Sequence, residues 1–263
     1  MKNIETLSAR EYHARTEISK HGLDLVAKAP ALYKHHQLHP QEQSPAMRWG
    51  EIIHTAVLEP ERFTQEYIQA PEGLNKTSRK AWAEFESENP GKSVVSRDEW
   101  DEVAQTVAAI SRHKIARLIL TKVSEEKLIE KSLFWIDGEI PCRCRPDGIS
   151  ETMKMVVDLK TCANATASAF AKDAYNYRYH VQAAFYLDAC KAVGLTVENF
   201  VFICVEKTAP YLTSVFVADE EMIEQGRKTY KADLEKYASC LAINDWPGYP
   251  EEIQFLSLPS YAK

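Results

Sequence analysis

The chain has 263 residues, of which 27% are charged, and its formal net charge is −6. An acidic chain is not expected to coat nucleic acid over its whole surface, so DNA binding would need a local basic patch or a basic channel in an oligomer. The length fits one large domain or two small ones, and no linker-like stretch divides the chain. We therefore expect one domain over residues 1–263.

Six cysteines are scattered along the chain, and none forms a C-x-x-C pair. This pattern predicts neither a zinc knuckle nor a secreted disulfide framework, and it suits a reducing compartment. No apolar run approaches the roughly 20 residues needed to cross a bilayer. We expect a soluble cytoplasmic protein without a membrane partner.

Two helix starts stand out in the first 60 residues. Ser19 has the character of an N-cap, and Pro30 should end the helix that follows it. Ser44 and Pro45 form a stronger signal, because serine caps the free amides and proline needs no hydrogen bond at the first helical position. The second helix should stop before Pro60.

The second helix carries a glycine and a histidine four residues apart, Gly50 and His54. Residues at this spacing share one face of a helix. A glycine inside a helix is unfavourable by about 1 kcal/mol relative to alanine, so it suggests close approach of another backbone. A lone histidine on a helix face is more often a hydrogen-bonded core residue than a metal ligand, and only later motifs can change that balance.

Residues 71–80 predict an exposed loop, followed by a short helix that opens with Trp82 and Phe85. Basic side chains beside aromatic ones suit phosphate contact and base stacking, although a solvated loop with a core-packing tryptophan is an equal alternative. Residues 96–120 predict one long amphipathic helix that serves the core. The candidate phosphate contacts in the loop are Lys76, Arg79 and Lys80.

A hairpin is predicted next, with strands 131–136 and 139–145 joined at Asp137-Gly138. Its second strand leads directly to Pro146-Asp147. Arg143 and Arg145 on that strand could contact phosphate or simply neutralise nearby carboxylates.

A second hairpin, with a turn over residues 148–154, would bring Asp147 beside Asp158 and Lys160. Asp158 and Lys160 share a face because strand side chains alternate. Two carboxylates this close repel unless they are protonated or bridged by a cation, and their oxygens favour Mg²⁺ or Mn²⁺. Lys160 could then orient a water or stabilise a developing oxyanion. A charged strand end with a surface salt bridge is the alternative.

The remaining elements continue an alternating pattern. A helix carries Gln182 and Tyr186, four residues apart and therefore on one face. Strands follow over residues 199–206 and 211–217, and Asp219 should cap a last helix that reaches about residue 241. The tail beyond Asp245 is rich in proline and should be irregular.

Four pieces occur in the order helix, strand, strand, helix: Gly50/His54, Asp147, Asp158/Lys160 and Gln182/Tyr186. This ordered set resembles the RecB-like branch of the PD-(D/E)XK nuclease superfamily, and most of all the RecE-type exonuclease domain, also called exonuclease VIII. Asp158 stands where many members carry glutamate, and the RecB-like branch accepts aspartate.

The resemblance spans roughly residues 44–217 and implies an α/β fold with a restriction-endonuclease-like core, a mixed central sheet flanked by helices. It divides the domain into an N-terminal helical lead over 1–43, a nuclease core over 44–217, and a C-terminal helix and tail over 218–263.

The same resemblance implies roles for individual residues. His54, Asp147, Asp158 and the main-chain carbonyl of Leu159 would hold Mg²⁺, with Mn²⁺ as a plausible substitute. Glu130 would match an additional glutamate of the family, although Glu126 competes for that role. Lys160 would act on the attacking water, Gln182 and Tyr186 would position the DNA strand or Lys160, and the candidate DNA contacts extend to Arg178.

The implied activity is 5′-to-3′ degradation of double-stranded DNA ends, leaving 3′ single-stranded tails for an annealing protein in recombination, as in enzymes that prophages carry. Such enzymes tend to form ring-shaped homo-oligomers, here a trimer or tetramer. No iron–sulfur cluster is expected, because the N-terminal cysteine of the cluster-bearing relatives is absent. The alternatives are an endonuclease, a single-strand-specific nuclease, or an inactive DNA-binding recombination scaffold.

Overall fold

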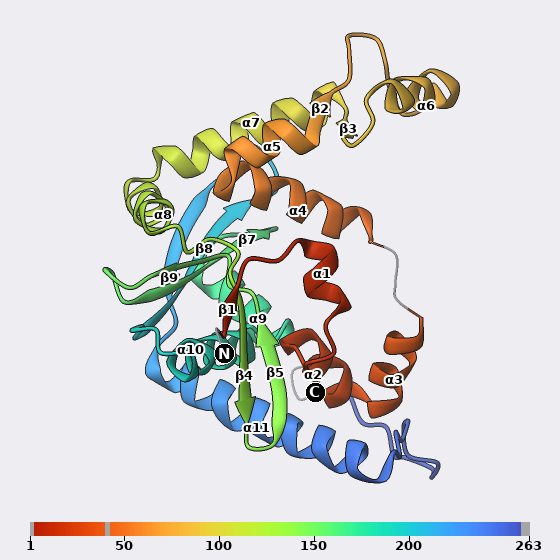
Figure 1. The fold of residues 1–263 in the computed structure, drawn as a ribbon, viewed down its shortest axis with the longest axis vertical. Coiled ribbons are helices and arrows are strands. Elements are labelled where there is room, and N and C mark those ends of the chain that lie inside the picture. The colour runs from red at the N-terminus through yellow and green to blue at the C-terminus, as the bar shows by residue number, and fades with distance from the viewer. Residues whose placement is uncertain (1–2, 40–42, 259–263) are drawn as a thin grey trace.

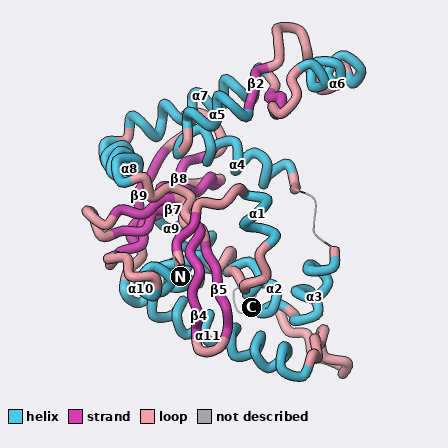
Figure 2. The backbone as a smooth tube through the Cα atoms, in the orientation of Figure 1, coloured by secondary structure: helices cyan, strands magenta, loops and turns pink. Residues whose placement is uncertain are grey.

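The computed structural model describes residues 3–39 and 43–258 and shows a mixed α/β fold (Figure 1). Most of the strands lie in the middle of the molecule, between helices on both sides (Figure 2). Nowhere in the described ranges is a helix both long enough and apolar enough to cross a membrane. The predicted tail continues without helix or strand to residue 258, and its last residues, 259–263, lie outside the described ranges.

The central sheet has four strands in the order β6-β7-β8-β9, and it is mixed, as predicted. β7 pairs with β8 in parallel, whereas the two outer pairs are antiparallel. A parallel connection needs a crossover, and α9 (Ala167–Asn176) and α10 (Tyr179–Ala192) supply it. The strands are β6 (Gly148–Ser150), β7 (Met155–Cys162), β8 (Asn199–Glu206) and β9 (Thr213–Val217).

A second sheet has the order β1-β4-β5, with β1 (Ile4–Glu5), β4 (Ser132–Asp137) and β5 (Ile140–Cys144). The predicted hairpin is present, but Asp137 pairs with Ile140, so its turn is formed by Gly138 and Glu139. Gly138 takes a φ of +63°, which glycine adopts without strain. β2 (Tyr67–Gln69) and β3 (Ser93–Val95) form a separate parallel pair.

The helices begin largely where the capping signals predict. Ser44 caps α4 by accepting a hydrogen bond from the Met47 amide at 3.2 Å, and Ser19 and Asp219 cap α2 and α11 in the same way. Besides α9 and α10, the helices are α1 (Ala9–Ala14), α2 (Lys20–Lys28), α3 (Pro30–Leu38), α4 (Pro45–Leu58), α5 (Pro60–Glu66), α6 (Arg79–Glu88), α7 (Arg97–Arg112), α8 (Lys114–Glu126) and α11 (Glu220–Ile243).

The prediction of one continuous helix over residues 96–120 is wrong. His113 leaves the helical region with φ −74° and ψ 109°, which separates α7 from α8. Its ring then caps α8, because Nδ1 accepts a hydrogen bond from the Ala116 amide at 3.2 Å. The apolar spacing continues through the break, so the sequence pattern did not reveal it.

Two hydrophobic cores lie on opposite faces of the central sheet. Val156, Phe200 and Phe202 belong to the core formed with α10 and α11. Val157 and Ile203 belong to the core formed with α4, α7 and α8. Because both faces are covered, the two central strands are apolar along most of their length.

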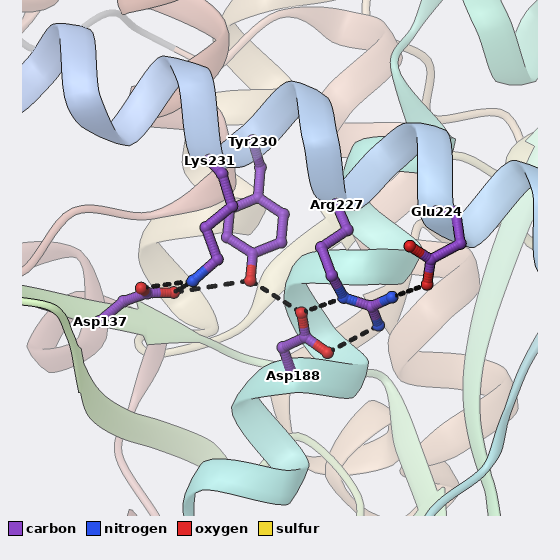
Figure 3. A network of polar contacts seen from close by, with 6 residues as sticks. All are labelled: Asp137, Asp188, Glu224, Arg227, Tyr230 and Lys231. Atoms are coloured by element: carbon purple, nitrogen blue, oxygen red, sulfur yellow. Dashed lines mark hydrogen bonds and ion pairs between the residues drawn. The ribbon is translucent and has the colours of Figure 1, made fainter.

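A polar network fixes α11 to its neighbours (Figure 3). Arg227 binds both carboxylate oxygens of Asp188 on α10, at 2.7 and 2.8 Å, and the Tyr230 hydroxyl donates to Asp188 at 2.8 Å. Lys231 binds Asp137 at the tip of the β4–β5 hairpin, at 2.7 Å. The network therefore joins α10 of the crossover, the last helix α11 and the β1-β4-β5 sheet.

Gly226 on α11 allows close helix packing, whereas Gly50 on α4 does not. A Cβ on Gly226 would lie 2.0 Å from the carbonyl oxygen of His180, so α11 can approach α10 only because this residue has no side chain. Around Gly50, by contrast, no described atom outside its own stretch of helix lies within 4 Å of where a Cβ would be. The prediction that another backbone approaches Gly50 is wrong.

Candidate active site

Two carboxylates meet at one end of the β6–β7 hairpin. Gly148 pairs with Val157, which places Asp147 and Asp158 next to each other at the end of that pairing. Both side chains are buried, and Asp147 Oδ2 accepts a hydrogen bond from the Leu159 amide at 2.7 Å. The turn of this hairpin is shorter than predicted, because β6 extends to Ser150.

A histidine and a glutamate approach Asp147 from other segments. His54 on α4 places Nδ1 3.4 Å from Asp147 Oδ2. One potential ligand atom from each of His54, Glu130 and Asp147 lies within 4.8 Å of the other two. Glu126, the other glutamate considered, instead accepts hydrogen bonds from Ser150 Oγ at 2.5 Å and from the Glu151 amide at 2.7 Å. Glu130 is thus the glutamate at the site.

Asp158 lies between a lysine and a glutamine. Its Oδ1 accepts a hydrogen bond from Gln182 Nε2 at 2.6 Å, and its Oδ2 lies 2.6 Å from Lys160 Nζ. Among the described residues, no donor reaches Oδ2 with the geometry of a hydrogen bond. Asp158 is outside the close set of three ligand atoms, so its predicted role as a metal ligand remains a prediction.

The electrostatics of the site favour a bound cation. Burial lowers the pKa of His54, but the Asp147 carboxylate outweighs this effect and raises the pKa to about 9. Burial, together with the charge of Asp147, raises the pKa of Glu130 to about 7. Burial also raises the pKa of Asp158, against the lowering effect of Lys160. Without a cation, protons must partly neutralise this cluster.

The donor set fits a divalent metal ion. Two carboxylates and an imidazole within ligand distance of one another provide the oxygen and nitrogen donors that such ions take in proteins. The Oδ2 atom of Asp158 is a further buried oxygen, and it forms an ion pair with Lys160 at 2.6 Å. We therefore describe this cluster as a candidate metal centre.

Two predicted site residues lie close by with less direct contacts. The Leu159 peptide is at the site through its amide, and its carbonyl as a ligand remains a prediction. Tyr186 is partly buried on α10, and its ring packs against Phe200 with centroids 6.2 Å apart. Of the Gln182/Tyr186 pair, it is the glutamine that contacts the carboxylate cluster.

Arg143 does not fit the predicted phosphate contact. Its side chain is buried and donates to the carbonyl oxygens of Tyr12 and Arg15, the latter at 2.6 Å. Arg143 therefore holds the N-terminal segment against β5. Arg145 fits the alternative that the sequence left open, because its Nε pairs with Glu130 Oε2 at 2.6 Å and partly neutralises that carboxylate.

The other basic residues predicted to contact DNA lie in different environments. Arg178 pairs with Asp24 at 2.9 Å and with Asp233, so it joins helices rather than facing solvent, and its predicted phosphate contact does not fit this position. Lys76 pairs with Glu99. Arg79 and Lys80 are exposed on α6, which projects from the body of the molecule (Figure 1).

Sequence reasoning missed the residues that surround this cluster. Tyr12 is buried with the guanidinium groups of Arg143 and Arg145 at 4.8 and 5.1 Å from its ring centroid. Tyr179 lies under the Lys160 ammonium, 4.6 Å from its ring centroid. The repeated tyrosines at 175, 177 and 179 were a visible signal, but nothing in the sequence indicated which of them faces the site.

One solved structure shares the fold over nearly the whole chain. A candidate exonuclease from Eubacterium rectale superposes with a TM-score of 0.64 at 13% identity, covering 97% of this chain and 96% of that one. A phage-related exonuclease from Haemophilus somnus 129PT gives a TM-score of 0.37 at 13% identity, covering 87% and 97%, which is too weak to support an argument. At such identities the likeness concerns the fold alone.

No protein of curated function matches the chain in sequence. A family model does match it, over residues 22–259, and its description is a PDDEXK-like domain of unknown function (DUF3799). This match covers most of the chain and confirms the predicted superfamily. The protein belongs to the PDDEXK-like family described by that model.

Proposed function

We propose that this protein is a Mg²⁺-dependent exonuclease that hydrolyses double-stranded DNA from its ends in the 5′-to-3′ direction and leaves 3′ single-stranded tails. The observation that carries the proposal is the meeting of His54, Glu130 and Asp147 beside the Asp158–Lys160 pair, on a PDDEXK-like fold. These groups come from separate segments, and a purely structural role would not require them to converge on one point.

The residues would divide the work as follows. His54 and Asp147, with Glu130, Asp158 and the Leu159 carbonyl, would hold Mg²⁺ or, as a substitute, Mn²⁺. A cation bound there would lower the pKa of a coordinated water and offset phosphate charge. Gln182 fixes the Asp158 carboxylate by donating to Oδ1 at 2.6 Å.

Lys160 supplies the positive donor. Burial lowers its pKa, but the Asp158 and Asp147 carboxylates outweigh this and raise the pKa above its ordinary value. The ammonium therefore stays protonated at neutral pH. It can hydrogen-bond the attacking water or a phosphate oxygen, and it stabilises the negative charge that develops as the water attacks phosphorus.

Because the chain has a negative net charge, DNA binding requires local groups of basic residues. Arg79 and Lys80 are exposed on the projecting α6 and would supply positive charge to DNA, and Lys76, which lies before α6, would join them by exchanging its pairing with Glu99 for a phosphate. We propose that several copies, three or four, surround the duplex as a ring and that a single-strand annealing protein takes up the 3′ tail. This arrangement would reconcile a net charge of −6 with a polyanionic substrate.

End-labelled DNA tests the activity directly. The unaltered chain with Mg²⁺ should degrade a linear duplex and leave a covalently closed circle intact, and blocking each end in turn reports the direction. Lys160→Ala should abolish degradation, whereas Lys114→Ala, an exposed lysine on α8, should not. Cleavage of the circle would indicate an endonuclease, and no hydrolysis with either Mg²⁺ or Mn²⁺ would indicate an inactive DNA-binding protein.

A further inference from the structure

A large aromatic side chain is exposed at the junction of α9 and α10. Tyr177 is the C-cap residue of α9, and 61% of its surface is accessible to solvent. Most of this ring is therefore open to solvent.

The ring is connected to the candidate active site through one other aromatic residue. Tyr177 stacks on Tyr179, with ring centroids 5.7 Å apart and planes at 29°. Tyr179 in turn lies 4.6 Å from Lys160 Nζ, and its ring packs against Phe170 and Phe202 of the core at 5.8 and 6.0 Å. Lys160, Tyr179 and Tyr177 thus form a continuous row from the carboxylate cluster to the surface.

The backbone that carries Tyr177 is held in place from several sides. Lys20 Nζ donates to the Tyr177 carbonyl at 2.9 Å, and the Tyr177 amide donates to the Asp173 carbonyl at 2.8 Å. The next residue, Arg178, has a φ of +56°, a left-handed conformation that is unfavourable for a side chain of this size. Its ion pairs with Asp24 and Asp233 maintain this conformation. A fixed turn therefore presents an aromatic ring that the fold leaves uncovered.

We propose that Tyr177, backed by Tyr179, is a stacking site for an unpaired base of the nucleic-acid strand whose phosphate lies at Lys160. This inference rests on the proposed function and adds to it that the strand reaches the site with at least one base out of the duplex. Every base has a π face, so the stacking site tolerates any sequence. The tyrosine hydroxyl has no part in it.

Equilibrium binding of a short fluorescent single-stranded oligonucleotide, in chelator so that no hydrolysis occurs, measures this site separately. Tyr177→Ser should weaken binding by about 5- to 150-fold, the range for loss of one base–aromatic stack. Tyr177→Phe should bind like the unaltered chain, because it keeps the ring. Tyr249→Ser is the matched control, since Tyr249 is also exposed but lies in the C-terminal tail. Thermal unfolding should show that all three variants are folded.

An oligonucleotide with abasic sites provides the sharpest comparison. It should bind the unaltered chain and Tyr177→Ser equally, because it has no base to stack. The proposal is overturned if Tyr177→Ser binds the normal strand as tightly as the unaltered chain, if Tyr177→Phe is as weak as Tyr177→Ser, or if the unaltered chain does not bind the strand.

This binding experiment and the end-labelled duplex assay together separate this inference from the proposed function. A chain that binds the strand through Tyr177 but never hydrolyses a duplex would refute the exonuclease and keep the stacking site. A chain that hydrolyses duplex DNA, and whose Tyr177→Ser variant binds and hydrolyses normally, would refute the stacking site and keep the exonuclease.

Discussion

Raising the pH in the absence of divalent cations should destabilise this protein through His54. The pKa of His54 is about 9 in the fold and 6.5 ordinarily, because the Asp147 carboxylate outweighs the effect of burial. The folded state therefore binds the proton more tightly than the unfolded state. Stability from this interaction is fully present below pH 6.5 and is lost as the pH rises towards 9.

The size of the effect follows from the pKa difference. The interval from 6.5 to about 9 corresponds to roughly 3 kcal/mol. The His54 side chain is 28% exposed, so solvent screening should reduce the observable loss to about 1–3 kcal/mol. For a chain of this length each kcal/mol shifts Tm by about 2–4 °C. Glu130 acts in the same direction at lower pH, because its raised pKa of about 7 makes its ionisation in the fold unfavourable.

Thermal unfolding followed at pH 6.5, 7.5 and 9, with chelator or with Mg²⁺, measures this loss. Mg²⁺ should reduce the decline, because a cation bound by deprotonated ligands replaces the protons that the cluster otherwise needs. His54→Gln should flatten the pH dependence in chelator, whereas His39→Gln, which alters an exposed histidine, should not. An unchanged slope in His54→Gln would refute the assignment of the loss to the His54–Asp147 pair.

Further variants test the packing and the polar contacts. Gly226→Ala should destabilise the fold by about 3 kcal/mol or more, because its Cβ would lie 2.0 Å from a backbone oxygen, as measured by denaturant unfolding. Gly50→Ala should stabilise it by up to about 1 kcal/mol in the same assay, since its Cβ would meet no described atom outside its own stretch of helix, and a loss of stability would contradict this prediction. Arg143→Met should lower the free energy of unfolding by about 2–3 kcal/mol, because the contacts to two backbone carbonyls are lost. An unchanged unfolding midpoint would contradict this structural role of Arg143. Gln182→Leu should lower Mg²⁺-dependent DNA hydrolysis by about 10- to 100-fold with the Tm largely kept, because Asp158 loses the donor that orients it; normal hydrolysis would show that this contact is dispensable.

Local signals in the sequence predicted the elements well where the physics is local. Ser19, Ser44 and Asp219 begin helices because their side-chain oxygens accept hydrogen bonds from amides only three residues ahead. The break at His113 escaped prediction because the apolar spacing of α7 continues into α8. A periodic pattern specifies which face is apolar, not whether the axis continues straight.

In the candidate site, too, the sequence predicted what depends on neighbouring residues and missed what depends on distant ones. The sequence by itself determined the paired carboxylates of one hairpin and the lysine two residues along β7, because strand alternation and hairpin pairing act over short separations. The superfamily followed from the order of the four motifs, which resembles that of known nucleases. Only the tertiary structure decided which other charges belong to the site. Arg178 pairs with a carboxylate 154 residues away, and Arg143 donates to a carbonyl 131 residues away. Glu130 pairs with Arg145 and has a carboxylate oxygen within 4.8 Å of a ligand atom of Asp147. A charged side chain takes the partner that the folded chain brings to it, and no local pattern records that choice.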